Sequence, residues 1–212
     1  MTSWNNVKKL LEDPEYFLTF EEFTEPLPNG FVETSAKKIR EPTDVFNIVP
    51  QLKKEQVSLR FIWNVKFMER NKVVGGCTEY ALITAALLRK AGFPTAIMDA
   101  LSIKDLYQSR ESWTVYAPHA MHTVNLVFYK GSWWLLDSAN YQFTKYITLP
   151  LLLKGYMPLI IHRGYSDIGV VTRRDKFELL FSLAKKVFPF DLEREVLYPE
   201  LLKYLHDHGS QP

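Results

Sequence analysis

The chemistry that this chain could perform centres on Cys77, the only cysteine in the sequence. It stands directly after Gly75-Gly76 and directly before a strongly helical run. A cysteine in the first turn of a helix points into the positive end of the helix dipole, which stabilises a thiolate and lowers the thiol pKa below its ordinary value of about 8.5. The glycines would let a substrate backbone approach and leave the Cys77 N–H free to point at a developing oxyanion. This stretch predicts a nucleophilic thiol, although a buried thiol in a tight turn would have the same local sequence.

A histidine and a carboxylate lie on a predicted hairpin that follows. Residues 122–129 (HTVNLVFY) and 133–138 (WWLLDS) have the composition of strands, and Lys130-Gly131 predicts a two-residue turn between them. In that register His122 and Asp137 share a face as diagonal neighbours, roughly 7 Å apart between backbones. A turn one residue longer or shorter would place them on opposite faces. The expected pairs are Tyr129 with Ser132, Phe128 with Trp133, Val124 with Asp137 and His122 with Ala139.

Other uses of these polar residues fit the pattern less well. His119 has the wrong parity with Asp137, and His119-x-x-His122 on a strand would point its two imidazoles to opposite faces. No Cys or carboxylate pattern completes a zinc site, so we expect neither a metal ion nor a cofactor. A single His at a strand start or Asp at a strand end is often structural. Their combination with a helix-start cysteine predicts a thiol nucleophile served by an imidazole base.

The two segments together resemble the transglutaminase-like superfamily. GGCTEYALITAALLRKAGFPTAI followed by HTVNLVFYKGSWWLLDSA is similar to its pattern of a helix-start Cys, a Leu-Leu-Arg-x-x-Gly helix end, a strand His and a Trp-rich strand that ends in Asp. The similarity covers roughly residues 55–140. It implies a papain-like site in which Cys77 is the nucleophile, His122 the general base and acid, and Asp137 the group that orients the imidazole.

Some positions depart from that pattern without removing a reacting group. The family commonly has Asp-Pro after the last strand, where this chain has Asp137-Ser138, and Ala-Trp after the His, where it has Thr123-Val124. A second oxyanion donor has no clear counterpart, and Trp63 and Gln56 are the candidates. The flanking β domains of animal transglutaminases are missing, so calcium-regulated cross-linking is not implied.

Predicted helices and strands would position Cys77, His122 and Asp137. Residues 77–91 predict a central helix that Gly92 ends, and residues 53–70 predict an amphipathic helix. Further strands are expected at 94–101, 157–162 and 168–172, and an irregular insertion at 102–118. The first fifty residues predict a short helix up to Glu12, then loops and short helices, and helical periodicity returns at 175–187 and 192–206.

These elements predict an α+β fold with a papain-like or transglutaminase-like core, in which the helix that starts at Cys77 packs on an antiparallel sheet. We expect one domain over residues 1–212, with a core at about 53–172, an N-terminal extension at 1–52 and a C-terminal helical extension at 173–212.

Composition narrows the classes of partner. The net charge of +2 comes from 26 basic and 24 acidic residues, and the basic pairs are scattered, so no stripe for nucleic acid is present. The longest apolar stretch, at 147–161, is broken by prolines, lysine and glycine, so no membrane span is expected. Since one cysteine cannot form an intrachain disulfide, the chain suits a reducing compartment, and we expect a cytoplasmic protein.

The expected function is a cysteine-dependent acyl transfer on an amide or related carbonyl, by hydrolysis or transamidation, as in a cysteine peptidase, amidase or acyltransferase. The substrate would be a peptide, a protein side-chain amide or a small amide. Tyr107, Trp113 and Tyr116 of the 102–118 insertion are candidate specificity contacts. One alternative is an inactive scaffold that keeps the fold. Another is an arylamine N-acetyltransferase, whose motif resembles Gly75-Gly76-Cys77-x-Glu79 but usually has an Arg before the glycines.

Overall fold

A five-stranded antiparallel sheet with helices packed on it forms the α+β architecture of the computed structural model, which describes residues 12–56, 61–102, 121–145 and 156–187. The order of the strands is β6-β5-β4-β3-β7. Their bounds are Thr95–Ser102 for β3, Met121–Tyr129 for β4, Ser132–Asp137 for β5, Gln142–Lys145 for β6 and Tyr156–His162 for β7. The α+β class that the sequence predicts is therefore confirmed.

The central helix, α5, spans Cys77–Lys90 and is buried along nearly its whole length. It ends where the sequence predicts: Gly92 has φ 90°, and the Phe93 N–H donates to the Leu88 carbonyl at 2.9 Å. This is the bond pattern of a glycine-terminated helix, in which only glycine adopts the left-handed conformation without cost.

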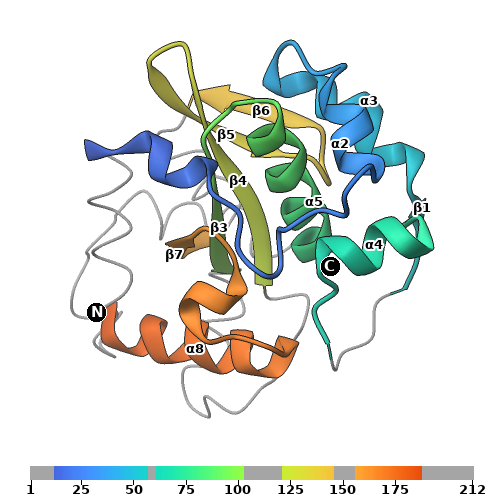
Figure 1. Cartoon of the computed structure of the whole chain (residues 1–212). Coiled ribbons are helices and arrows are strands. Elements are labelled where there is room, and N and C mark those ends of the chain that lie inside the picture. The colour runs from blue at the N-terminus through green and yellow to red at the C-terminus, as the bar shows by residue number, and fades with distance from the viewer. Residues whose placement is uncertain (1–11, 57–60, 103–120, 146–155, 188–212) are drawn as a thin grey trace.

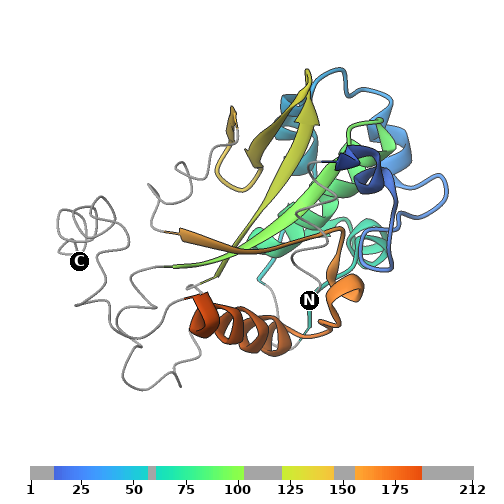
Figure 2. The same cartoon turned by 90° about the vertical axis from the view of Figure 1, so that its left-hand side faces the viewer.

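Shorter helices surround α5 on the side away from the sheet (Figure 1). They are α2 (Phe31–Ala36), α3 (Val45–Ile48) and α4 (Val65–Asn71), with the 3-10 turns η2 (Pro42–Asp44) and η3 (Val49–Gln51). The 3-10 turn η1 (Pro14–Leu18) instead packs its Phe17 on the opposite face of the sheet. The last of the described helices, α8 (Arg173–Val187), lies apart from this group and contacts β3 and β7, below which it runs in the turned view (Figure 2).

Both α5 and α8 pack on the same face of the sheet. Side chains alternate along β3, so Ile97 packs in the core around α5, Leu101 packs with Phe177 of α8, and Asp99 lies between them on that face. The opposite face packs a separate apolar group that includes Phe17 of η1. The region where α5 and α8 meet is therefore built on the middle strands β3 and β4.

The β4–β5 hairpin has the predicted register. Lys130 and Gly131 have φ values of 50° and 73°, the two positive angles that a type I′ turn requires. The paired residues are Tyr129 with Ser132, Phe128 with Trp133, Val127 with Trp134, Leu126 with Leu135 and Asn125 with Leu136. The ladder ends at this last pair, so the predicted pairs Val124 with Asp137 and His122 with Ala139 are not formed, although the register is the one that they require.

The prediction of one amphipathic helix over residues 53–70 is wrong. β1 (Lys53–Lys54) instead pairs in parallel with β2 (Val73–Val74), and among the described residues of this range the helix α4 begins only at Val65. Asn64 starts α4, because its side chain accepts the Phe67 N–H at 2.9 Å as an N-cap. Apolar spacing alone did not reveal this boundary.

A strand at 168–172 is also not formed. The 3-10 turn η5 (Tyr165–Ile168) is ended by Gly169 at φ 68°, and within this range only Thr172 makes a bridge, to Phe61. β6, with the polar sequence QFTK, was not predicted. The predicted helix up to Glu12, the 192–206 helix and residues 103–118 of the insertion lie outside the described residues, apart from Glu12 itself.

Candidate active site

Cys77 is the first residue of α5, with Gly76 as the N-cap, and its thiol is half-buried. Its sulfur lies 3.9 Å from the carbonyl oxygen of Met121, the first residue of β4. The β4–β5 ladder ends at Asn125, so none of the described strands pairs with the Thr123 N–H and the Met121 carbonyl on that edge. The thiol occupies this position and accepts a hydrogen bond from the Thr123 N–H.

His122 joins the thiol to a carboxylate. Its Nε2 lies 2.8 Å from Oδ2 of Asp137, both side chains are buried, and the ring also interacts with the Cys77 thiol. Since Nε2 is engaged by the carboxylate, Nδ1 is the nitrogen that is left for the thiol. Asn140 fixes Asp137 in turn, with its N–H at 3.2 Å from Oδ1 and its Nδ2 at 2.8 Å from Oδ2.

The environment drives this pair towards its charged form. Burial opposes ionisation of Cys77, but the His122 hydrogen bond, the charge of Lys176 and the Thr123 N–H together lower the pKa of the thiol below its ordinary value. Burial also lowers the basicity of His122, but Asp137 and Cys77 outweigh it and raise the pKa of His122 to about 9. Both pKa shifts favour a thiolate beside an imidazolium, and the helix dipole acts in the same direction.

A buried carboxylate organises the first turn of α5. Glu79 is fully buried, accepts the Gly76 N–H at 3.1 Å and the Trp63 N–H at 3.2 Å, and pairs with Arg173 of α8. The Gly76 N–H is therefore already engaged. Of the two candidate oxyanion donors, Trp63 packs its ring on Phe67 and Gln56 is exposed. Their roles stay predictions, as does that of the Cys77 N–H.

The sequence did not single out a polar cluster behind the thiol. Thr78, Asp99, Thr123, His162, Tyr165 and Lys176 form one buried hydrogen-bonded group. Its members come from α5, β3, β4, β7, η5 and α8. One signal was present in the sequence, an Asp in the middle of an otherwise apolar predicted strand, since a buried charge requires a partner.

The structure thus brings all three predicted residues together, Cys77 at the start of α5, His122 on β4 and Asp137 at the end of β5. The insertion residues proposed for specificity lie outside the described residues. Within the described part of the chain, no group of three or more His, Cys, Asp or Glu side chains is placed to hold a metal ion. No helix of that part is long and apolar enough to cross a membrane.

Comparisons with known proteins give structural similarity alone. No family model matches the chain, and no curated protein matches it. A candidate cysteine protease from Cytophaga hutchinsonii is 15% identical over 78% of this chain and 52% of its own, with a TM-score of 0.49. An arylamine N-acetyltransferase from Mycobacterium abscessus is 17% identical over 74% of this chain and 49% of its own, with a TM-score of 0.24. The chain spans about half the length of each.

Proposed function

We propose that this chain is a cysteine-dependent acyl-transfer enzyme that acts on an amide or related carbonyl. One observation carries the proposal: a helix-start thiol interacts with an imidazole whose other nitrogen lies 2.8 Å from a buried carboxylate. These are the nucleophile, base and orienting group that covalent acyl transfer needs. The resemblance of the sequence to the transglutaminase-like superfamily supports the same assignment.

The reaction that these groups support has two halves. The Cys77 thiolate attacks the carbonyl carbon, and collapse of the tetrahedral intermediate breaks the bond to the leaving group, which takes the proton from His122. His122, now neutral, then removes a proton from water or an amine, which attacks the thioester and releases Cys77. Asp137 keeps the imidazole oriented and stabilises its charged form throughout.

No specific observation favours either alternative, the inactive scaffold or the arylamine N-acetyltransferase. A thiol far from the imidazole would favour an inert scaffold, whereas Cys77 and His122 interact. Arylamine acetyl transfer uses the same three groups, so trapping the acyl-enzyme with acetyl-CoA distinguishes it from amide cleavage. Peptide, side-chain amide and small-amide substrates all remain within the proposal.

The pH dependence of Cys77 alkylation tests the activated thiol. We expect iodoacetamide to modify wild-type Cys77 with a midpoint clearly below the ordinary thiol value of about 8.5, because the thiolate is stabilised. In His122→Ala the midpoint should rise. Cys77→Ala identifies the labelled site by mass spectrometry. A midpoint near 8.5 or above that does not change in His122→Ala would contradict the proposal.

A further inference from the structure

The side chain of Lys176 from α8 is fully buried beside the residues that follow the two reacting groups. Its Nζ donates to Thr78 Oγ1 at 3.0 Å and to Thr123 Oγ1 at 2.6 Å. Thr78 directly follows Cys77, and Thr123 directly follows His122. The same ammonium therefore connects the start of α5 to the start of β4, at the point where the thiol meets the imidazole.

A buried carboxylate holds this ammonium in place. Asp99 of β3 lies 2.7 Å from Nζ through Oδ1, and Tyr165 accepts from Nζ at 2.9 Å. The other oxygen of Asp99 lies 3.0 Å from His162 Nε2. Because desolvating a lysine and an aspartate is costly and a hydrophobic pair of similar volume is often as stable, this arrangement calls for a reason other than stability.

We propose that Lys176 is a positioning residue of the active site: held by Asp99, its ammonium fixes Thr78 and Thr123 and stabilises negative charge on Cys77. This inference rests on the proposed function. Among the described residues, the titratable groups that interact with the thiol are His122 from β4, Lys176 from α8 and Tyr165 from η5.

The electrostatics agree with this geometry. Against the effect of burial, the Lys176 charge is one of the causes that lower the pKa of Cys77. Asp99 is kept ionised by the same charge, because Lys176 and His162 outweigh burial and hold the pKa of its carboxyl well below the usual range. The ammonium thus faces a permanent negative charge on one side and the thiol region on the other.

The test is the alkylation midpoint of Cys77 in Lys176→Met, which keeps the side-chain volume and removes the charge. We expect the midpoint to rise by about one pH unit, the effect of losing a nearby opposite charge. Lys176→Arg keeps the charge and should restore most of the wild-type midpoint. Lys90→Met removes one charge at the far end of α5, where Lys90 pairs with Glu33 on the surface, and should leave the midpoint unchanged.

Thermal unfolding followed by circular dichroism separates this role from a structural one. A structural lysine would lower the melting temperature of Lys176→Met and leave the midpoint unchanged, which would overturn the inference. If Lys176→Met does not fold, the double variant D99N/K176M replaces it, because it leaves no unpaired charge of this pair in the core; the midpoint should rise there too.

The His122→Ala variant separates the two proposals. A midpoint that rises in His122→Ala but not in folded Lys176→Met or D99N/K176M refutes the role of Lys176 and leaves the proposed function standing. A wild-type midpoint near 8.5 that neither change moves refutes both.

Discussion

His122 lies between a carboxylate and a thiol, and each of them favours its protonated form. Against the cost of burial, Asp137 and Cys77 raise the pKa of His122 to about 9, while the imidazolium lowers that of Cys77. The ion pair is therefore favoured above the lowered pKa of Cys77 and below a pH of about 9. We expect activity to fall on acidification as the thiolate is protonated, and to fall above a pH of about 9 as His122 loses its proton.

Asp137→Asn tests the carboxylate at the scale of one residue. The amide keeps a hydrogen-bond acceptor for Nε2 but has no charge to stabilise the imidazolium, so the pKa of His122 should fall by about one unit or more. Titration by NMR with ¹³C-labelled histidine measures it, with His122→Gln to assign the signal. Asp175→Asn, at a half-buried carboxylate in the first turn of α8, is the matched control. An unchanged His122 titration in Asp137→Asn would contradict the assignment.

At the scale of elements, the start of α5 depends on a second helix. Glu79 ties the N-cap residue of α5 to the Trp63 backbone and to Arg173, so the turn that carries Cys77 is fixed from several sides. The β4–β5 hairpin sets the other half of the site, because its turn decides which face carries His122 and Asp137.

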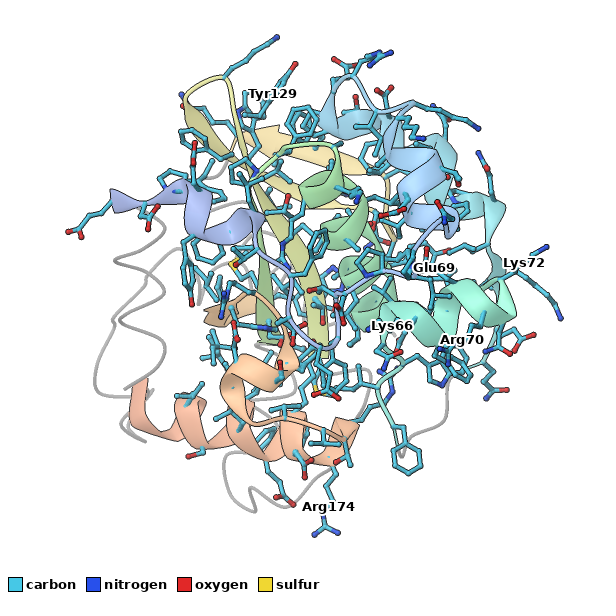
Figure 3. All side chains as sticks on the ribbon, viewed as in Figure 1. Lys66, Glu69, Arg70, Lys72, Tyr129 and Arg174 are labelled. Carbon is cyan, nitrogen blue, oxygen red and sulfur yellow. The ribbon has the colours of Figure 1, made fainter. Side chains whose placement is uncertain are left out.

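Glu79→Gln should destabilise the protein strongly. It removes the negative charge that buried Arg173 faces, and breaking a buried pair in this way costs about 3–5 kcal/mol. Glu178→Gln removes the same charge from an exposed pair on α8, whose partner Arg174 projects away from the molecule (Figure 3). This control should leave the unfolding free energy nearly unchanged, because solvent screens an exposed pair. Urea unfolding measures both, and equal effects would refute the role of Glu79.

Gly131→Ala tests the turn of the hairpin. Gly131 has φ 73°, and a Cβ there would meet nothing within 4 Å, so the cost is that of the left-handed backbone alone, about 1–2 kcal/mol. Lys130→Asn is the opposite change, because asparagine is favoured at that position of a type I′ turn, and it should raise the melting temperature. If Gly131→Ala were as stable as the wild type, the I′ geometry would be wrong.

At the scale of the whole molecule, α8 and the sheet form one unit around a buried charge pair. Asp99 is on the inner strand β3 and Lys176 on α8, which places part of the predicted C-terminal extension inside the core. The division into a core at 53–172 and an extension at 173–212 stays a prediction, but these contacts argue against an extension that the core could lose without effect.

The dependence of the unfolding free energy on acidic pH should reveal the contribution of the Asp99–Lys176 pair. The pKa of Asp99 lies well below its unfolded value of about 3.9, so its stabilisation is complete above that pH and is lost as the pH falls below it. Between about pH 4 and pH 2.5 the unfolding free energy of the wild type should fall more steeply than that of D99N/K176M, by up to about 1.4 kcal/mol per pH unit. Urea unfolding at each pH measures the slopes, and identical slopes would show that Asp99 is not held ionised.

The sequence by itself determined the features that depend on neighbouring residues. The end of α5 at Gly92 follows from local backbone preference, and the Lys130-Gly131 turn fixes the parity that places His122 with Asp137. Local patterns did not predict two other features. The start of α4 is set by the Asn64 cap, and β1 forms because it pairs with β2, which lies further along the chain.

Only the tertiary structure decided how these pieces meet. Cys77 approaches β4 across 44 positions of sequence, and Lys176 reaches Thr78 across 98. Such contacts depend on how α5 and α8 bury their faces on one sheet, and no spacing along the chain records that packing. The sequence therefore does not distinguish Lys176 from the other basic residues, of which the chain has 26 in all.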